Sequence, residues 1–171
     1  MKEYQIINSK KKDIDEIMAI LKDAKAFLKS YGSSQWQDSY PKKELILDDI
    51  KKKNHYSCFY EGNLVGIMTI TTYDENYDVV YNGSFSNNNY YAIHRIAVKA
   101  EYRNHGIAKK LLAFAENLAI SNDIHSIRID THQVNIPMQR LLLSASYSYV
   151  GIIHLKENQD DYVRLAYEKI F

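Results

Sequence analysis

The sequence predicts a single α/β domain, in which helices flank a central, twisted, mixed β-sheet. Three observations support this prediction. The chain has 171 residues, the usual size of one compact domain. Its 46% hydrophobic and 25% charged residues are ordinary values for a globular protein. Segments with the helical period alternate with segments that have the two-residue period of strands, in the order β-α-α-β-β-β-α-β-α-β-β. We therefore expect residues 1–171 to form one domain.

The elements follow from local residue patterns. We predict, in chain order, an extended segment at 3–8, helices at 13–31 and 41–53, strands at 55–60, 64–72 and 90–99, a helix at 104–121, a strand at 126–132, a helix at 136–145, and strands at 147–155 and 161–169. The first helix has Asp13 as a candidate cap and Gly32 as a stop, and Pro41 can open the second.

The connections are also readable. Glu61, Gly62 and Asn63 are typical of a hairpin turn, and the segment KENQD at 156–160 predicts the turn between the last two strands. The connection at 73–89 is polar, tyrosine-bearing and long for a compact domain. Such a segment is either a wall of a functional site or an excursion without a role.

Composition excludes several classes of protein. Lys and Arg total 22 and Asp and Glu total 21, so the net charge of +1 argues against a nucleic-acid partner. Cys58 is the only cysteine, which excludes an internal disulfide and a Cys-based zinc site, and we expect no metal. No apolar run approaches the ~20 residues of a membrane span. The first residues lack the apolar core of a signal peptide, so we expect a cytoplasmic protein without a membrane partner.

The most informative unit is the strand–turn–helix IHRIAVKAEYRNHGIAKKLL at 93–112. Its turn has the pattern R-x-x-G-x-A, from Arg103 to Ala108. The first turn of a helix has unpaired N–H groups and a positive dipole end, which together can hold a pyrophosphate. Gly106 lets an anion approach the backbone because it has no Cβ atom, Ala108 is small, and Arg103 adds positive charge. A Walker loop is excluded because there is no G-x-x-x-x-G-K-[ST] pattern, and a Rossmann fingerprint is excluded because Gly106 stands alone.

In this context the turn resembles the acetyl-CoA motif of the GNAT superfamily of N-acyltransferases. The residues Asn135-x-x-Met138 and Ser146-Tyr147 are similar to the superfamily's second conserved block. The predicted helices and strands follow the same order as in the superfamily over nearly the whole chain. The segments QWQDSYP, IHRIAV and IRIDTHQVN also resemble a bacterial branch whose substrate is unsettled. The resemblance implies a GNAT-like domain in which two splayed strands form the acyl-CoA cleft.

The resemblance also implies that acetyl-CoA is the co-substrate. The strand at 96–98 would pair with the pantetheine arm like an added strand, the amides at 104–108 would hold the pyrophosphate, and Asn135 would bond the arm from the other side. The residues implied to bind the co-substrate are Ile96, Ala97, Val98, Arg103, Asn104, His105, Gly106, Ile107, Ala108 and Asn135.

The implied reaction is direct attack of an amine on the thioester. Asp130 is the first candidate for the base, because this stretch resembles ribosomal-protein N-acetyltransferases, in which that place holds a catalytic glutamate. The alternative for Asp130 is a structural ion pair, for example with Arg128 or Arg95.

Two histidines compete for the role of base, since a pKa of about 6.5 suits proton transfer near neutrality. We predict that His94 shares a strand face with Ile96 and Val98, and that His132 shares a face with Asp130. For each histidine, the alternative is a packing role.

One departure from the family concerns the acid. Leu142 stands where the family has a tyrosine, so either another hydroxyl protonates the leaving sulfur or none is required. Ser146 likewise replaces the usual glycine. Cys58 is expected to be a buried strand residue. Aromatic rings suit an amine acceptor, and the candidates for its pocket are Trp36, Tyr40 and Tyr81, together with Tyr73 and Tyr77.

The sequence thus predicts an acetyl-CoA-dependent N-acetyltransferase for a primary amine of a small molecule or a peptide, and a homodimer stays open. A non-catalytic acyl-CoA-binding sensor is the alternative, which Leu142 favours slightly. A tRNA-modifying acetyltransferase is a third hypothesis. The near-neutral charge argues against it.

Overall fold

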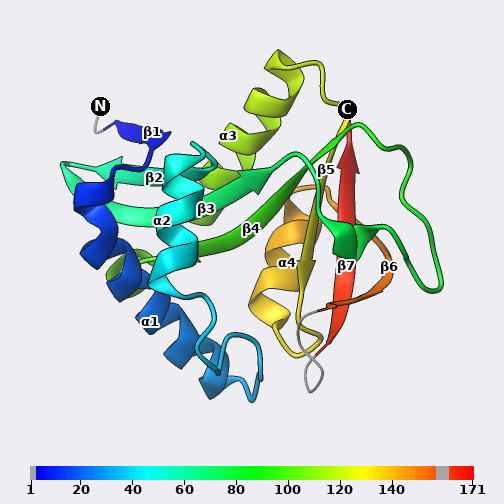
Figure 1. Ribbon diagram of the computed structural model, residues 1–171, viewed down its shortest axis with the longest axis horizontal. Coiled ribbons are helices and arrows are strands. Elements are labelled where there is room, and N and C mark those ends of the chain that lie inside the picture. Colours follow the sequence, from blue (N-terminus) through cyan, green and yellow to red (C-terminus); the bar gives the residue numbers. More distant parts are fainter. Residues whose placement is uncertain (1–2, 157–161) are drawn as a thin grey trace.

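The computed structural model describes residues 3–156 and 162–171, and its elements follow the predicted order (Figure 1). The strands are β1 (Tyr4–Asn8), β2 (His55–Tyr60), β3 (Asn63–Thr71), β4 (Tyr90–Val98), β5 (Ser126–Thr131), β6 (Ser148–His154) and β7 (Val163–Ile170). The α-helices are α1 (Ile14–Ser30), α2 (Lys43–Lys51), α3 (Ile107–Ser121) and α4 (Ile136–Ser144). The predicted turn at 156–160 lies outside the described residues except for Lys156, as does residue 161 of the last predicted strand.

The strands form one mixed sheet in the order β1-β2-β3-β4-β5-β7-β6. Only β4 and β5 pair in parallel, and they do so over Tyr90–Ile93 and Ser126–Ile129. Beyond these residues the two strands separate, so β1–β4 and β5–β7 form two halves that run in different directions (Figure 1). The predicted splayed pair is confirmed, and it opens the sheet between β4 and β5.

Two apolar cores hold the helices against the sheet. One core joins α1 and α2 to β3 and β4, and includes Ile17, Leu21, Ile46 and Ile67. The other joins α3 and α4 to the central strands, and includes the following buried residues: Ile93, Ile107, Leu111, Leu112, Ala115, Ile127 and Leu142. Because the helices are packed from both sides, the ends of β4 and β5 are fixed relative to α3 and α4.

Two helices begin later than predicted. Helix α2 begins at Lys43 rather than at residue 41, because Lys42 keeps an extended conformation with φ −79° and ψ 154°. Helix α3 begins at Ile107 rather than at residue 104, because Asn104 and Gly106 have φ values of 64° and 75°. Such left-handed residues cannot be part of a right-handed helix. The residues before Ile107 therefore form a turn with its own conformation.

The predicted ends of α1 are correct in position but not in every detail. Asp13 occupies the N-cap position, yet its side chain makes no capping hydrogen bond. Gly32 ends the helix as predicted, with φ 72°. The N–H groups of Gly32 and Ser33 donate to the carbonyls of Lys29 and Leu28, which is the Schellman arrangement.

The long connection at 73–89 is packed against the sheet. It includes a short 3-10 turn, Glu75–Tyr77, and then crosses to the far edge of the sheet beside β6 (Figure 1). There the backbone of Tyr81 exchanges two hydrogen bonds with Ile152, at 2.7 and 2.9 Å. Tyr77 is 3% exposed in a small core with Tyr90 and Ile153. The segment was expected to be either a wall of a functional site or an excursion without a role, and its packing against the sheet supports the wall.

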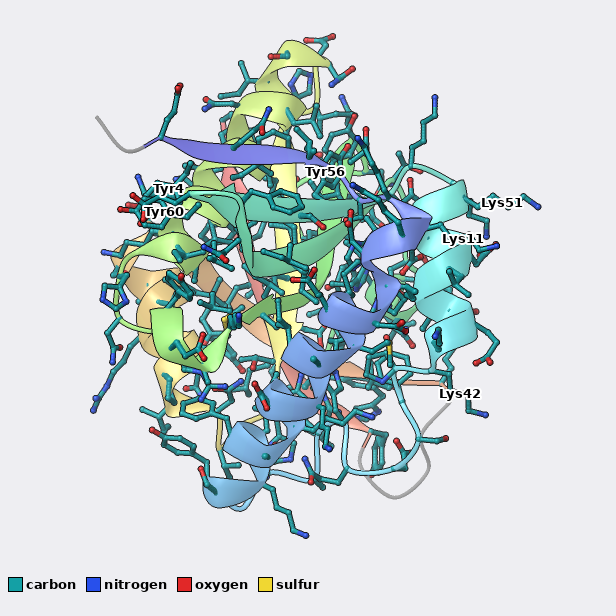
Figure 2. All side chains as sticks on the ribbon, turned by 90° about the vertical axis from the view of Figure 1, so that its left-hand side faces the viewer. Tyr4, Lys11, Lys42, Lys51, Tyr56 and Tyr60 are labelled. Carbon is teal, nitrogen blue, oxygen red and sulfur yellow. The ribbon has the colours of Figure 1, made fainter. Side chains whose placement is uncertain are left out.

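The outer surface of α1 and α2 carries the lysine-rich runs. Lys51 is the last residue of α2, where its charge complements the helix dipole. Figure 2 shows Lys11, Lys42 and Lys51 pointing outward along this side, with Tyr4 and Tyr60 at the opposite edge. Within the described part of the chain, no helix combines the length and the apolar character needed to cross a membrane.

Candidate active site

A cleft of about 1380 Å³ lies where the two halves of the sheet separate. Its walls come from the connection between α1 and α2, from β4 and the turn before α3, and from the ends of β5 and α4. The predicted site residues that line it are Trp36, Tyr40, Tyr73, His94, Ile96, Ala97, Val98, Arg103, Asn104, Gly106, Ile107, Ala108, Asp130 and Asn135. His105, His132 and Tyr81 do not.

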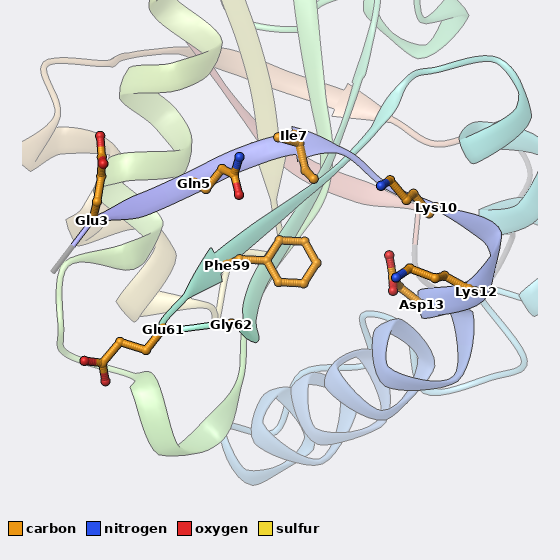
Figure 3. A pocket seen from close by; sticks show the side chains of 9 residues that line it. All are labelled: Glu3, Gln5, Ile7, Lys10, Lys12, Asp13, Phe59, Glu61 and Gly62. Atoms are coloured by element: carbon orange, nitrogen blue, oxygen red, sulfur yellow. The ribbon is translucent and has the colours of Figure 1, made fainter.

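A second, smaller pocket of about 380 Å³ lies between β1, the β2–β3 hairpin and the start of α1 (Figure 3). Its lining mixes both signs of charge, from Glu3, Glu61 and Asp13 to Lys10 and Lys12. None of the predicted site residues contributes to it. The large cleft is therefore the candidate site.

A β-bulge in β4 shapes the middle of the cleft. Thr69 of β3 pairs with His94 and Ile67 pairs with Ala97, so β4 has one residue more than β3 over this interval. Arg95 lies in the bulge with φ 51°. Because directly paired residues point to the same face, His94 shares its face with Ala97. The prediction that it shares a face with Ile96 and Val98 is wrong, since the extra residue shifts the alternation.

The side chain of Arg95 is held by two partners from the N-terminal helices. Its Nη2 lies 2.5 Å from Oδ2 of Asp49 in α2, and both side chains are less than 10% exposed. Its Nη1 donates to the hydroxyl of Tyr40 at 2.7 Å. Thr69 also donates to Asp49, at 3.3 Å. A buried ion pair with additional hydrogen bonds fixes its members in place.

The turn before α3 has the form of an anion site. Asn104 and Gly106 are both left-handed, and the first helical hydrogen bond runs from Lys110 to the carbonyl of Gly106. The preceding N–H groups have no helical partner. A Cβ atom on Gly106 would meet nothing within 4 Å, so the space in front of the turn is open. The Arg103 guanidinium lies 4.3 Å above the Phe27 ring at the rim of the cleft.

Asn135 faces this turn from the other side of the cleft. It is the N-cap of α4, and its Oδ1 accepts a hydrogen bond from the N–H of Met138 at 3.2 Å. The cap uses the oxygen, so a bond from Asn135 to a ligand would come from Nδ2. At the other end of α4, Leu142 is fully buried in the core and does not line the cleft.

Asp130 lies at the end of β5 with a hydrogen-bond donor of its own. The hydroxyl of Tyr77 donates to Oδ2 at 2.8 Å. Neither Arg128 nor Arg95 pairs with Asp130, because they pair with Glu168 and Asp49. Burial raises the pKa of Asp130 to about 6, although the Tyr77 hydrogen bond opposes this shift. The group is an anion near neutrality and a stronger base than an ordinary carboxylate.

His94 lies beside Tyr77, the residue that donates a hydrogen bond to Asp130. Its Nε2 is 3.0 Å from the Thr71 hydroxyl and 3.7 Å from Oδ2 of Asp74. The ring of Tyr77 stacks over the imidazole, with centroids 6.4 Å apart. Burial lowers the pKa of His94 to about 4, and the Arg95 charge contributes in the same direction. The imidazole is therefore neutral at pH 7.

Two predicted residues lie elsewhere. His132 follows β5 rather than continuing it, so it does not share a strand face with Asp130. Its Nδ1 accepts from the N–H of Val134 at 3.1 Å, and its Nε2 lies 3.4 Å from the Ser34 hydroxyl. Tyr81 stacks on His154 at 4.3 Å beside β6, so it lies outside the cleft that contains the other predicted aromatic residues Trp36 and Tyr40. Sequence could not show either outcome, because both depend on where the chain turns after a strand.

The sequence analysis missed Asp74, which lines the cleft, and Asp49, which holds the cleft residue Arg95. Asp49 lies three residues after Ile46, on the apolar face of α2, and an acid on a core-facing stripe was a usable signal. Asp74 lies in the long polar connection, where no periodicity identifies it. Cys58 is fully buried as predicted, and burial raises its pKa to about 11. A thiol of this kind is not a nucleophile at neutral pH.

Comparison with known proteins relates the cleft to a family. The model of the acetyltransferase (GNAT) family matches residues 16–146. A GNAT-family acetyltransferase from Streptococcus agalactiae is 33% identical, over 98% of this chain and 95% of that chain, with a TM-score of 0.87. The PaiA N-acetyltransferase of Thermoplasma acidophilum, solved with coenzyme A, is 17% identical over 99% of both chains, with a TM-score of 0.70, and supports the fold. No curated protein matches the sequence.

Proposed function

Because this chain belongs to the GNAT family of acetyltransferases, we propose that it transfers an acetyl group from acetyl-CoA to a primary amine of a small molecule or a peptide. One observation carries the proposal. A single cleft contains an anion-binding turn at one end, and the Asp130 carboxylate and a neutral His94 at the other. The first suits the pyrophosphate of acetyl-CoA, and the second suits an amine that must lose protons.

The co-substrate would lie along β4. The N–H groups at 104–108 would hold its pyrophosphate, with Arg103 at the rim. Its pantetheine arm would run back along Val98, Ala97 and Ile96, whose backbone lines the cleft, and Asn135 would donate from the other side. His105 contributes at most its backbone, since its side chain is exposed and outside the cleft. This course brings the thioester to Arg95 and His94.

Asp130 would act as the base, directly or through a water. The amine must be neutral when it attacks the carbonyl carbon. A carboxylate with a pKa of about 6 takes a proton more readily than a histidine with a pKa of about 4. His94 would hold the acceptor through a hydrogen bond, and the packed position of His132 gives it no part. Trp36 and Tyr40 would form the wall against which the acceptor packs.

Calorimetry with acetyl-CoA tests the first half of the proposal. Gly106→Glu puts a negative charge where the pyrophosphate would lie, and micromolar binding by the unmodified protein should be lost. Gly62→Glu is the matched control, because Gly62 has φ 78° and open space around its Cβ position but lies in the β2–β3 hairpin. Equal binding by all three proteins, or by none, would refute the site.

An amine screen with release of free CoA tests the second half. Acetyl transfer to any amine removes the alternative, a non-catalytic acyl-CoA-binding module. That alternative rests on Leu142, which cannot supply a proton. Tight binding of acetyl-CoA with no turnover across small amines and peptide N-termini would favour it. We also propose that the chain forms a single domain and that the protein is cytoplasmic.

A further inference from the structure

The proposed transfer needs a proton for the leaving sulfur. When the C–S bond breaks, its electron pair goes to sulfur and coenzyme A departs as a thiolate. Leu142, at the position where the family resemblance implies a tyrosine, is fully buried and has no proton to give. A hydroxyl donor would have to come from another element of the cleft. This inference rests on the proposed function.

Most hydroxyls of the cleft are already engaged or lie at the wrong end. The hydroxyl of Tyr73 donates to Asp78 at 2.7 Å, and that of Thr71 is bonded to His94. Tyr102 adjoins Arg103, next to the anion-binding turn. Ser39 and Thr131 carry alcohols, which are far weaker acids than a phenol.

Tyr40 differs from these groups in its hydrogen bonding. It accepts a hydrogen bond from Nη1 of Arg95 at 2.7 Å. Because the guanidinium is the donor in this bond, the phenolic proton stays free, and no atom within residues 3–156 and 162–171 accepts it. Its ring comes from the α1–α2 connection and lines the cleft. The residue is thus a donor without an acceptor at a wall of the site.

The position of Tyr40 matches the end of the pantetheine arm. An arm held by the turn at 104–108 and by Val98, Ala97 and Ile96 reaches Arg95 next, and Tyr40 is the residue bonded to Arg95. Asp130 lines the same cleft as Tyr40 and Arg95, so all three groups border the space in which the thioester would lie.

We propose that Tyr40 is the general acid of this enzyme and replaces the absent tyrosine at position 142. The amine nitrogen bonds to the carbonyl carbon, the C–S bond breaks, and the Tyr40 proton moves to sulfur to give free CoA. The amine proton goes to Asp130. The Tyr40 phenolate that remains is stabilised by Arg95. Asp130 then releases its proton to water and Tyr40 takes one up from water, so that one amide and one thiol result and both residues return to their starting forms.

The electrostatics of Tyr40 agree with this role. Burial raises its pKa above 10, and Arg95 opposes the shift. The hydroxyl therefore holds its proton at neutral pH, as an acid must before the transfer. A thiol has a pKa of about 8.5, so a thiolate is a weaker base than a phenolate, and the transfer depends on stabilisation of the Tyr40 phenolate. The guanidinium contact then favours the charged product of the proton transfer.

The test compares two acetyl donors in the unmodified protein, in Tyr40→Phe and in Tyr149→Phe. Tyr149 is a control because it lies on β6, is half exposed and packs its ring against that of Tyr167. The first donor is acetyl-CoA. The second is S-acetyl-4-nitrothiophenol, whose thiol is acidic enough to leave without protonation.

With acetyl-CoA, Tyr40→Phe should lower kcat about 100-fold, within the usual effect of a general acid. Its Kd for acetyl-CoA by calorimetry and its melting curve should stay close to those of Tyr149→Phe. With the nitrothiophenyl donor, the loss should shrink to a few-fold. A kcat within twofold of the unmodified protein would overturn the role of Tyr40 alone.

Equal losses with both donors would also overturn it, since Tyr40 would then orient the acceptor rather than protonate sulfur. Failure of the unmodified protein to bind acetyl-CoA would refute the proposed function itself. The calorimetry therefore separates the two failures.

Discussion

The Tyr77 hydroxyl donates a 2.8 Å hydrogen bond to the Asp130 carboxylate, and the two residues are 53 positions apart in the chain. This bond joins the long connection after β3 to the end of β5. The same tyrosine ring stacks over His94 of β4. A segment that the sequence left open as either a wall of the site or an excursion thus contacts both Asp130 and His94.

Removing this bond should change the pH dependence of the reaction. The Tyr77 bond favours the charged form of Asp130 and lowers its pKa, so Tyr77→Phe should raise that pKa above its value of about 6. A base must be deprotonated to act, and the acid limb of the kcat/KM profile should move to higher pH. Tyr56→Phe, in a core behind the cleft, should leave the limb unchanged. An unchanged limb in both variants would show that Asp130 is not the base.

The carboxylate of Asp130 should cost the protein stability at neutral pH. Its folded pKa of about 6 is above the unfolded value near 3.8, so the folded state binds more protons between these values, and stability falls as pH rises through this window. Asp130→Asn removes this effect and should raise the free energy of unfolding at neutral pH by at most about 3 kcal/mol, since each pKa unit corresponds to about 1.36 kcal/mol.

Denaturant unfolding at pH 4 and pH 7.5 measures this effect. The stability of Asp130→Asn relative to the unmodified protein should be greater at pH 7.5. The lowered pKa of His94 acts in the opposite direction but is present in both proteins, and largely cancels in the difference. A relative stability that is greater at pH 4 would contradict the raised pKa.

The attachment of the long connection depends on a close backbone approach at Gly83. A Cβ atom there would lie 1.7 Å from the carbonyl oxygen of Val150 in β6, and a backbone atom cannot move aside cheaply. Gly83→Ala should therefore destabilise the protein by about 1–3 kcal/mol, as overpacking usually does. It should also lower acetyl transfer, since Tyr77 belongs to the same segment. Ser84→Ala, at the exposed neighbouring position, is the control. Equal melting temperatures for the two variants would contradict this account.

Ser146 has a left-handed backbone conformation, which glycine adopts at a lower cost in free energy. It follows α4 with φ 66°, and its N–H and that of Tyr147 donate to Leu143 and Leu142 in the Schellman arrangement. This conformation costs a residue with a Cβ atom roughly 1–2 kcal/mol, part of which is offset by the greater unfolded entropy of glycine. Ser146→Gly should thus stabilise the protein by about 0.5–1 kcal/mol. Thermal unfolding would show a higher melting temperature, and an unchanged or lower one would contradict the strain.

Local patterns in the sequence determined the elements of this protein and one end of its site. The period of two along β4 and the period of 3.6 along α3 are set by backbone geometry, which is the same in every protein. The turn from Arg103 to Ala108 was also readable, because helix termini and glycine have fixed properties. The structure differs from this prediction only in the start of the helix, which begins at Ile107 because Asn104 and Gly106 are left-handed.

Only the tertiary structure decided which groups meet at this end of the cleft. The bulge at Arg95 rotates His94 to a new face, Asp49 neutralises Arg95, and Tyr77 reaches Asp130 across the sheet. Burial then moves the pKa of Asp130 up and that of His94 down. These outcomes depend on contacts between residues far apart in the chain and on how much water the fold excludes. Local periodicity encodes neither the long-range contacts nor the exclusion of water, because both arise only when separate elements pack together.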